Sequence, residues 1–253
     1  MSAGPHVAFI GASKRFPGGF EALAGVTFDV PRGQFCALVG PSGSGKSTLL
    51  RAVNGLTELT AGEVRVGGLS VSAASLPQVR RKVGMAHQDF GLVDRASVAE
   101  NMIAGAVADI ATWRALLGLY PVACRAKACA LLAEVGLAPE HLARRVSELS
   151  GGQRQRVGIA RALMRDPEVL VADEPVASLD PRASDEVLEL MRREARARNV
   201  TVLCSLHQLD LARRFADRIV ALRGGRLVFD GPAAAFDGAT ASQIYGGALE
   251  SVQ

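Results

Sequence analysis

Short apolar runs separated by turn residues dominate the first third of the chain. Each run is bounded by Gly, Pro or charged positions, a pattern that predicts strands. The predicted strands are Val7–Ile10, Val26–Val30, Gln34–Val39, Glu63–Val66 and Val83–Ala86. The third run leads into a glycine-rich segment, and the residues that follow it, Ser47–Gly55, predict a helix.

The pattern changes in the middle of the chain, from about residue 90 to residue 164. Alanine and leucine recur there at helical spacing, and Gly136 is a helix stop. Strands and helices then alternate: strand Val169–Ala172, helix Pro181–Arg198, strand Val200–Ser205, helix Leu209–Ala216, and strands Ile219–Leu222 and Arg226–Asp230. This alternation predicts an α/β protein with a mostly parallel sheet. Residues after about 232 are small and polar, and we expect them to pack peripherally.

Composition narrows the class of protein. Of the 253 residues, 49% are hydrophobic and 21% are charged, which is typical of a globular chain. The first residues lack the basic and apolar regions of a secretory signal. A net charge of +4 is too small to indicate a nucleic-acid partner. Cys36, Cys124, Cys129 and Cys204 have neither metal-ligand nor disulfide spacing, so we expect reduced, mostly buried thiols of a cytosolic protein.

The segment GPSGSGKS, Gly40–Ser47, has the spacing of a phosphate-binding P-loop, and it lies between a predicted strand and a predicted helix. Its glycines allow the backbone amides to surround phosphate groups. Lys46 would reach the β- and γ-phosphates of a nucleotide, and the Ser47 hydroxyl would bind Mg²⁺. The predicted nucleotide-binding residues here are Gly40, Pro41, Ser42, Gly43, Ser44, Gly45, Lys46, Ser47 and Thr48.

Two acidic residues, Asp173 and Glu174, follow the apolar strand Val169–Ala172. They therefore lie at the carboxyl edge of the predicted sheet, where α/β proteins bind ligands. Asp173 would hold Mg²⁺ through water, and Glu174 would polarise an attacking water. Without the P-loop, two solvated loop carboxylates would be an equally good interpretation.

A second glycine-rich motif, LSGGQ, occupies Leu149–Gln153 and precedes a helical pattern that begins near Gly152. The free amides and the positive dipole end of that helix would face an anion. Ser150 could instead be a simple helix N-cap, although capping alone does not explain two consecutive glycines and a glutamine. Because each motif supplies half of a nucleotide site, the pair suggests two copies of the chain closing over ATP.

These motifs, and their order from about Phe9 to Pro232, resemble the nucleotide-binding subunit of an ATP-binding cassette (ABC) transporter. The resemblance implies one nucleotide-binding domain over residues 1–253, with a P-loop NTPase (RecA-like) core and mostly parallel sheet, an N-terminal antiparallel β-subdomain and an inserted helical subdomain. The core with its β-subdomain would span about 1–89 and 165–232, the helical subdomain about 90–164, and a C-terminal tail 233–253.

The resemblance also implies roles for individual residues. Gln88 matches the glutamine that touches Mg²⁺ and senses the transmembrane partner, and His207 the histidine that contacts the γ-phosphate. Phe16 matches the aromatic that stacks on adenine, although it could simply pack within the β-subdomain. The catalytic residues would be Lys46, Gln88, Glu174 and His207; the Mg²⁺ residues Ser47, Gln88 and Asp173; and the residues that reach the nucleotide from a second copy Ser150, Gly151, Gly152, Gln153 and Asp180.

Further strings, among them ADEPVASLDP and TWRALLGLYP, resemble the ATPases of bacterial phosphonate importers. This implies a peripheral subunit at the cytoplasmic face of the inner membrane, partnered by a second copy, by permease subunits and indirectly by a periplasmic binding protein. His87 and Gly91 depart from the family pattern, which there has an aromatic residue and Asn. Asp89–Tyr120, with Trp113 its best single candidate, would receive a permease helix or form the helical subdomain's own core.

Two other interpretations stay open. The ATPase could serve a different importer, for phosphite, phosphate or amino acids, or an exporter. It could also be a structural or regulatory ABC subunit of a soluble carbon–phosphorus lyase-type complex. A small-molecule P-loop kinase is disfavoured because such an enzyme has no use for LSGGQ.

Overall fold

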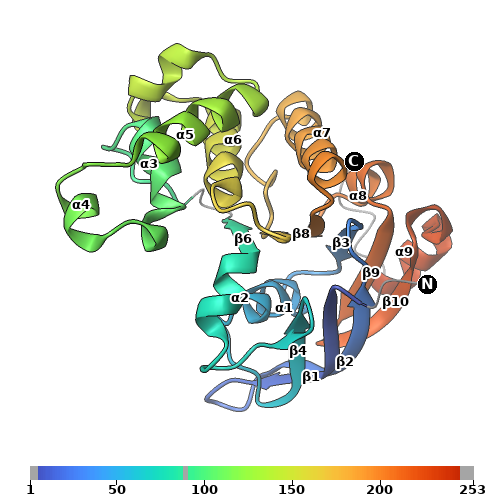
Figure 1. Cartoon of the computed structure of the whole chain (residues 1–253). Coiled ribbons are helices and arrows are strands. Elements are labelled where there is room, and N and C mark those ends of the chain that lie inside the picture. Colours follow the sequence, from blue (N-terminus) through green and yellow to red (C-terminus); the bar gives the residue numbers. More distant parts are fainter. Residues whose placement is uncertain (1–4, 88–90, 246–253) are drawn as a thin grey trace.

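Two sheets organise the chain in the computed structural model, which describes residues 5–87 and 91–245 (Figure 1). A four-stranded sheet has the order β2-β1-β4-β5, and a six-stranded sheet the order β10-β9-β3-β8-β7-β6. The strands are β1 (Val7–Arg15), β2 (Glu21–Val30), β3 (Phe35–Val39), β4 (Ala61–Val66), β5 (Leu69–Ser70), β6 (Val83–Ala86), β7 (Val169–Ala172), β8 (Thr201–Ser205), β9 (Arg218–Arg223) and β10 (Arg226–Pro232).

Helices surround the six-stranded sheet and form a separate block to one side of it (Figure 1). They are α1 (Lys46–Val53), α2 (Leu76–Lys82), α3 (Val98–Ala104), α4 (Thr112–Leu116), α5 (Val122–Glu134), α6 (Gly151–Leu163), α7 (Pro181–Arg198), α8 (Leu209–Phe215) and α9 (Gly238–Tyr245). Helices α3 to α6 make up the block. The predicted fold class, with its mostly parallel sheet, antiparallel sheet and helical insertion, is confirmed.

The six-stranded sheet separates two hydrophobic clusters, and β3 shows how. All five residues of β3 are buried, as expected for a central strand of a parallel sheet covered on both faces. Its side chains alternate between the faces: Phe35, Ala37 and Val39 join the cluster under α3 and α5 to α8, while Cys36 and Leu38 join the cluster with α1 and the antiparallel sheet. The P-loop that follows β3 is thus anchored between two cores.

Strands β1 and β2 are longer than their apolar runs predicted. The reason is that Gly11, at φ +59, accommodates an irregularity in the β1–β2 register, after which pairing resumes as far as Arg15 and Glu21. The extended hairpin brings its tip, residues 16–20, toward the P-loop. By contrast, β6, β7 and α7 have the predicted bounds.

The cysteines agree only in part with the expectation of mostly buried thiols. All four cysteines are free, with Cys36 and Cys204 buried and Cys129 exposed. Burial raises the pKa of the Cys36 thiol to about 12, so this thiol is chemically inert. None of the helices in residues 5–87 and 91–245 combines the length and the apolar character that crossing a membrane requires.

The expectation that the segment after residue 232 packs peripherally is wrong for its described part, residues 233–245. Phe236, Ala241 and Ile244 are buried in the larger hydrophobic cluster. The hydroxyl of Tyr245, on α9, accepts a hydrogen bond of 2.8 Å from the backbone N–H of Gly40. The few apolar residues of this segment share one face, so its low overall hydrophobicity concealed a packed element. The C-terminal helix therefore supports the first residue of the P-loop.

Replacing Tyr245 by Phe should leave the buried Gly40 N–H without an acceptor. We expect a loss of about 1–3 kcal/mol in the free energy of unfolding, the usual cost of an unsatisfied buried donor. For a chain of this size that corresponds to a fall of roughly 2–12 °C in Tm. The measurement is thermal unfolding by circular dichroism. Tyr120→Phe is the control, because among the described residues the Tyr120 hydroxyl has no hydrogen-bond partner; equal Tm values would contradict the role of Tyr245.

Candidate nucleotide-binding site

The loop between β3 and α1 has a shape that requires glycine at two positions. Gly40 and Gly45 have φ values of +143° and +106°. A Cβ atom at Gly40 would lie 2.1 Å from the carbonyl oxygen of Leu222, and one at Gly45 would lie 2.5 Å from that of Ala22. The loop is therefore packed tightly against β9 and β2, and its closeness to both leaves no room for other side chains.

Lys46 begins α1 and is 4% exposed. Its ammonium donates hydrogen bonds to the carbonyl oxygens of Gly40 (2.7 Å) and Pro41 (3.1 Å). Burial lowers the pKa of Lys46, and the nearby carboxylates of Glu174 and Asp173 act in the opposite direction. An ammonium has three N–H donors. Two hold the loop closed, and the third is available for a phosphate oxygen.

Asp173 is the point where three elements meet. Its Oδ1 accepts hydrogen bonds from the Ser47 hydroxyl of α1 (2.9 Å) and from the Ser205 hydroxyl at the end of β8 (2.8 Å). Asp173 itself follows β7, so the P-loop helix and two adjacent strands are tied to one buried carboxylate. Sequence reasoning identified Ser47 and Asp173 and missed Ser205, whose only signal was its position at the end of a strand.

Glu174 has an unusual backbone conformation, with φ +48. A β-carbon is strained in this left-handed region, and such strain collects at functional sites. The Glu174 N–H donates to the Ser205 hydroxyl (2.8 Å), so Ser205 positions both acidic residues. Oε1 of Glu174 lies 2.5 Å from Nε2 of His207. The structure thus brings Asp173, Glu174 and His207 together at the carboxyl edge of β7 and β8.

A cavity of about 210 Å³ lies over the P-loop. Its lining consists of Phe20, Ala22, Ser42, Gly43, Ser44, Gly45, Lys46, Ser47, Thr48, Glu174 and His207. Phe20 was not expected in this site. Phe16, the expected aromatic, is absent from the lining, and the Nζ atom of Lys14 lies 5.2 Å from the centre of its ring. Gln88 lies outside the described residues.

The oxygen atoms of Ser47 and Asp173 are of the type that Mg²⁺ prefers. In residues 5–87 and 91–245 no group of three or more His, Cys, Asp and Glu side chains could hold a metal ion. A magnesium ion would take the Ser47 hydroxyl as a direct ligand and Asp173 through a water molecule. Phosphate oxygens and water would complete its shell, which is the usual arrangement at nucleotide sites. The residues present fit such an ion.

The LSGGQ motif forms the N-terminus of α6, and two of its residues form a capping box. The Ser150 hydroxyl accepts from the Gln153 N–H (3.3 Å), and Oε1 of Gln153 accepts from the Ser150 N–H (2.9 Å). Helix capping therefore accounts for the glutamine as well as the serine. A Cβ atom at Gly151 would lie 3.2 Å from a methyl carbon of Leu179, a tight contact that a small shift of that side chain would relieve.

The motif lines a second cavity, of about 370 Å³, together with the start of α7. There the Asp180 carboxylate caps α7 by accepting from the Ala183 N–H (3.0 Å). The cavity is lined by Gly136, Leu137, Ser150, Gly151, Gly152, Gln153, Arg156, Ser178, Leu179, Asp180, Ala183 and Glu186. It shares no lining residue with the cavity over the P-loop. Within one chain the two sets of predicted nucleotide-binding residues are thus separate.

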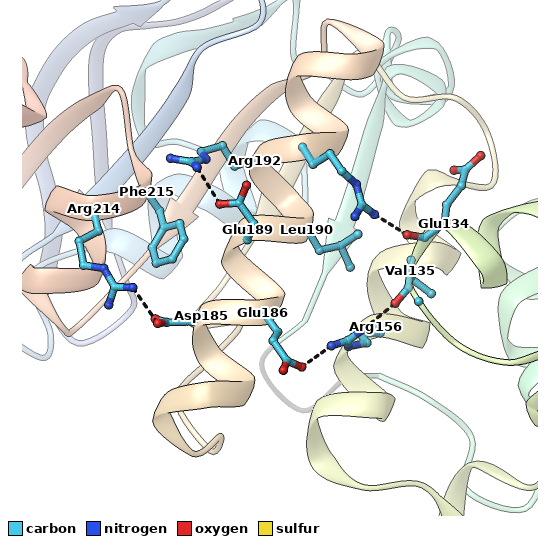
Figure 2. A pocket seen from close by; sticks show the side chains of 12 residues that line it. Glu134, Val135, Arg156, Asp185, Glu186, Glu189, Leu190, Arg192, Arg214 and Phe215 are labelled. Atoms are coloured by element: carbon cyan, nitrogen blue, oxygen red, sulfur yellow. Dashed lines mark hydrogen bonds and ion pairs between the residues drawn. The ribbon is translucent and has the colours of Figure 1, made fainter.

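A larger cavity, of about 660 Å³, lies where α5 and α6 meet α7 and α8 (Figure 2). Several of its charged side chains pair with one another. Arg156 donates to Glu186 (2.5 Å) and to the Val135 carbonyl (3.0 Å), and Arg214 pairs with Asp185. Arg156 and Glu186 also line the LSGGQ cavity, so their ion pair joins α6 of the helical block to α7 of the core. We interpret this cavity as a structural joint between the two.

Taken together, the fold and the loop around Lys46 define a P-loop nucleoside triphosphatase. A family model described as ABC transporter matches residues 23–177, and the chain belongs to this family. A solved dimer of the ATP-binding cassette MJ0796 with bound ADP and Pi is 28% identical to it, with a TM-score of 0.77 over 90% of this chain and 98% of that chain. CbiO1 from Clostridium perfringens, part of the CbiONQ transporter complex, is 25% identical, with a TM-score of 0.81 over 94% and 93%.

Curated relatives share more sequence identity with this chain than these two solved structures do. The Phosphonates import ATP-binding protein PhnC of Hyphomonas neptunium is 51% identical, over 89% of this chain and 87% of the relative. The protein of the same name from Hydrogenovibrio crunogenus is 46% identical, over 91% and 85%. That of Staphylococcus aureus is 41% identical, over 95% of each chain. These similarities confirm the resemblance seen in the sequence motifs.

Ser205 should matter for catalysis through its hydrogen bonds to Asp173 and Glu174, although it has no role in contacting phosphate itself. Ser205→Ala removes one hydrogen bond to each acidic residue, and losing about 1.4 kcal/mol of positioning would lower kcat for ATP hydrolysis about tenfold. The assay is phosphate release at saturating ATP. The matched control is Ser184→Ala, a buried serine on α7 whose hydroxyl has no partner among the described residues. Equal kcat values for Ser205→Ala and the control would refute the positioning role.

Proposed function

We propose that two copies of this chain form the ATP-hydrolysing motor of an importer for phosphonates or related phosphorus oxyanions. Each ATP would lie between the P-loop cavity of one copy and the LSGGQ cavity of the other. The observation that carries this proposal is the separation of the two cavities within one chain, because each presents only part of a nucleotide site. The dimeric MJ0796 cassette supports the two-copy arrangement, and the relatives' names support the substrate class.

The P-loop binds the phosphates through its backbone amides and the third N–H donor of Lys46. Ser47 and Asp173 would hold Mg²⁺, which when bound neutralises charge on the β- and γ-phosphate oxygens. Gln88, from outside the described residues, would complete this group. Asp173 is oriented for the task by Ser205, which holds one of its oxygens toward Ser47.

Glu174 acts as the base in hydrolysis. Its carboxylate accepts a proton from water as the water oxygen bonds to the γ-phosphorus and the bond to the β–γ bridging oxygen breaks, giving ADP and phosphate. His207 bonds Glu174 through Nε2 and lines the same cavity, so it holds the carboxylate in place before ATP binds, and on leaving Glu174 the same N–H can donate to a γ-phosphate oxygen. The Ser205 bond to the Glu174 backbone helps to fix the position of this group.

The partner copy contributes the N-terminus of α6, a helix of 13 residues. Its free amides and positive dipole end attract the γ-phosphate. Because only the γ-phosphate contacts both copies, hydrolysis removes the contact that holds them closed. Closing and reopening of the dimer would move the permease between its inward-facing and outward-facing states.

The permease would bind beside β6, where a cavity of about 490 Å³ includes His87 and Gly91. Gly91 has φ +55, a conformation that glycine and asparagine both adopt, so glycine in place of the family's Asn preserves the backbone shape. Along the neighbouring segment Leu92 and Tyr120 pack against the core, whereas Trp113 is 60% exposed. The segment Asp89–Tyr120 would thus contribute to the core of the helical subdomain and also offer side chains to a permease helix. The subunit would lie peripherally at the cytoplasmic face of the bacterial inner membrane, below a periplasmic binding protein.

Glu174→Gln should retain ATP binding and lose hydrolysis. A positioned general base contributes about 10²–10⁴-fold to the rate, so we expect kcat to fall by that factor. Because ATP then persists, a closed dimer should accumulate, detectable by light scattering with ATP and not with ADP. Glu189→Gln, an exposed position on α7, is the matched control.

A second substitution tests the contribution of the LSGGQ face. Gly151→Arg added to Glu174→Gln places a large side chain on the exposed start of α6, and the ATP-dependent dimer should disappear while ATP binding persists. A dimer that survives this substitution would show that the two copies do not meet through the LSGGQ face. Unimpaired hydrolysis in Glu174→Gln would remove Glu174 from the role of base.

The importer assignment predicts stimulation by ligand. We expect the chain to co-purify with permease subunits when they are co-expressed. In proteoliposomes containing this complex and its binding protein, a phosphonate should raise ATP hydrolysis, while an amino acid should not. Co-purification with soluble enzymes in place of a permease would favour the soluble-complex alternative, and stimulation by the amino acid alone would favour a different importer.

A further inference from the structure

The imidazole ring of His141 joins a short 3₁₀ segment, Pro139–Ala143, to the LSGGQ motif. On one side of the ring, Nδ1 lies 3.0 Å from the carbonyl oxygen of Ala138. On the other side, Nε2 lies 3.3 Å from Nε2 of Gln153. The segment packs against α3 and α5, so the ring has a fixed support within the helical block. Gln153 is therefore held by a side chain from outside its own helix.

The two contacts determine which ring nitrogen carries the proton. A carbonyl oxygen can only accept a hydrogen bond, so Nδ1 of His141 must donate to Ala138. In a neutral imidazole the other nitrogen is then an acceptor. Nε2 of His141 consequently accepts from the side-chain NH₂ group of Gln153. The ring thus presents an acceptor, and no donor, to the glutamine amide.

That acceptor decides how the Gln153 amide is oriented. With its NH₂ group turned toward His141, Oε1 faces the Ser150 N–H and accepts a hydrogen bond of 2.9 Å from it. Turning the amide over would place a donor against the Ser150 N–H and an acceptor against Nε2 of His141, so both hydrogen bonds would be lost. His141 therefore selects the one orientation in which the capping box closes.

We propose that His141 is a positioning residue for the LSGGQ surface, because it orients the Gln153 amide and so keeps the first turn of α6 in the form that meets the partner's nucleotide. This inference rests on the proposed two-copy site and adds to it a residue outside the described linings of both cavities. The amides of a helix N-terminus point at an anion only while the first turn is ordered. His141 acts through Gln153 and needs no contact with ATP.

The folding of the 3₁₀ segment does not depend on the imidazole. Leu142 packs against the larger hydrophobic cluster. The backbone contributes two hydrogen bonds of 3.0 Å, from the His141 N–H to the Ala138 carbonyl and from the Arg144 N–H to the His141 carbonyl. These contacts remain whatever side chain occupies position 141. Substitutions there should consequently change the orientation of the Gln153 amide and leave the fold intact.

Dimerisation with Mg-ATP in the Glu174→Gln background tests the proposal, with dissociation constants of the dimer measured by light scattering. His141→Leu offers no acceptor and should weaken the dimer about 2- to 12-fold, the factor in an equilibrium constant that one hydrogen bond is worth. His141→Gln keeps an oxygen near the place of Nε2 and should restore the affinity. Glu140→Gln, at the exposed neighbouring position, is the matched control. Mg-ADP binding by calorimetry should be equal in all of them, because the P-loop is unchanged.

A double-substitution cycle tests whether His141 acts through Gln153. Gln153→Ala removes the amide that the ring orients, so adding His141→Leu to it should weaken the dimer no further. Additive effects of the two substitutions would overturn the proposal. Unchanged dimer affinity in His141→Leu, or equal weakening in His141→Leu and His141→Gln, would overturn it as well. Failure of the two-copy site itself looks different, since Glu174→Gln with His141 intact would give no ATP-dependent dimer and both proposals would fall.

A spectroscopic measurement covers the case in which His141→Leu disturbs folding. The chain has four histidines, so isotope-labelled histidine gives few signals. His141→Gln assigns the signals of residue 141 in nitrogen–proton correlation spectra of the full chain under mildly alkaline conditions. We expect the proton on Nδ1 and none on Nε2. A proton on Nε2 would overturn the proposal, because the ring would then face the Gln153 NH₂ group with a second donor.

Discussion

The buried carboxylate of Asp173 is the interaction on which the rest of the site depends. An ionised group of this kind is costly to bury unless it is fully hydrogen-bonded. Its two hydroxyl partners come from α1 and β8, so satisfying the charge also fixes the P-loop helix against two strands of the sheet. The neighbouring ammonium of Lys46 is held within the same region by its own loop carbonyls. The placement of Ser47 and of the P-loop helix against the sheet therefore follows from one electrostatic requirement.

Sequence reasoning located the parts of the site that are local in the chain. The P-loop, the acidic pair after β7 and the N-terminus of α6 each depend on a few consecutive residues, whose spacing carries the chemistry. Ser205 and Phe20 were missed because each belongs to the site only through a distant segment: Ser205 bonds two residues at the end of β7, and Phe20 lines the cavity over the P-loop. A serine at a strand end and a phenylalanine near a turn have many ordinary explanations.

In the fold, too, features set by consecutive residues were predicted well, and features set by distant contacts were not. Continuous apolar runs such as β7 were predicted to the residue, because a fully buried parallel strand is uniform along its length. The β1–β2 hairpin was underestimated, since glycine at irregular positions breaks the alternation that marks a strand. Residues 233–245 were misjudged because their few apolar side chains are spread thinly, yet several of them are buried in the core. Packing against an existing core decided that element, and its own composition did not.

The LSGGQ segment shows one set of atoms serving both folding and recognition. Ser150 and Gln153 complete each other's backbone hydrogen bonds, and that pairing leaves the remaining amides at the start of α6 unoccupied. The Arg156–Glu186 ion pair then connects this helix to α7, which begins at Asp180. These contacts connect the helical block to the core within a few residues of the LSGGQ surface. We propose that this surface meets a second copy.

At Glu174, the left-handed backbone sets the stability of the folded chain against its rate of ATP hydrolysis. Glycine would relax that conformation at no steric cost and, at a compatible site, would be the more stable choice. A carboxylate is needed there nonetheless, so the chain retains a residue that its backbone disfavours. Selection for heat resistance alone would favour glycine at this position and so give inactive cassettes. A laboratory search for more stable variants would therefore need to keep Glu174 unchanged.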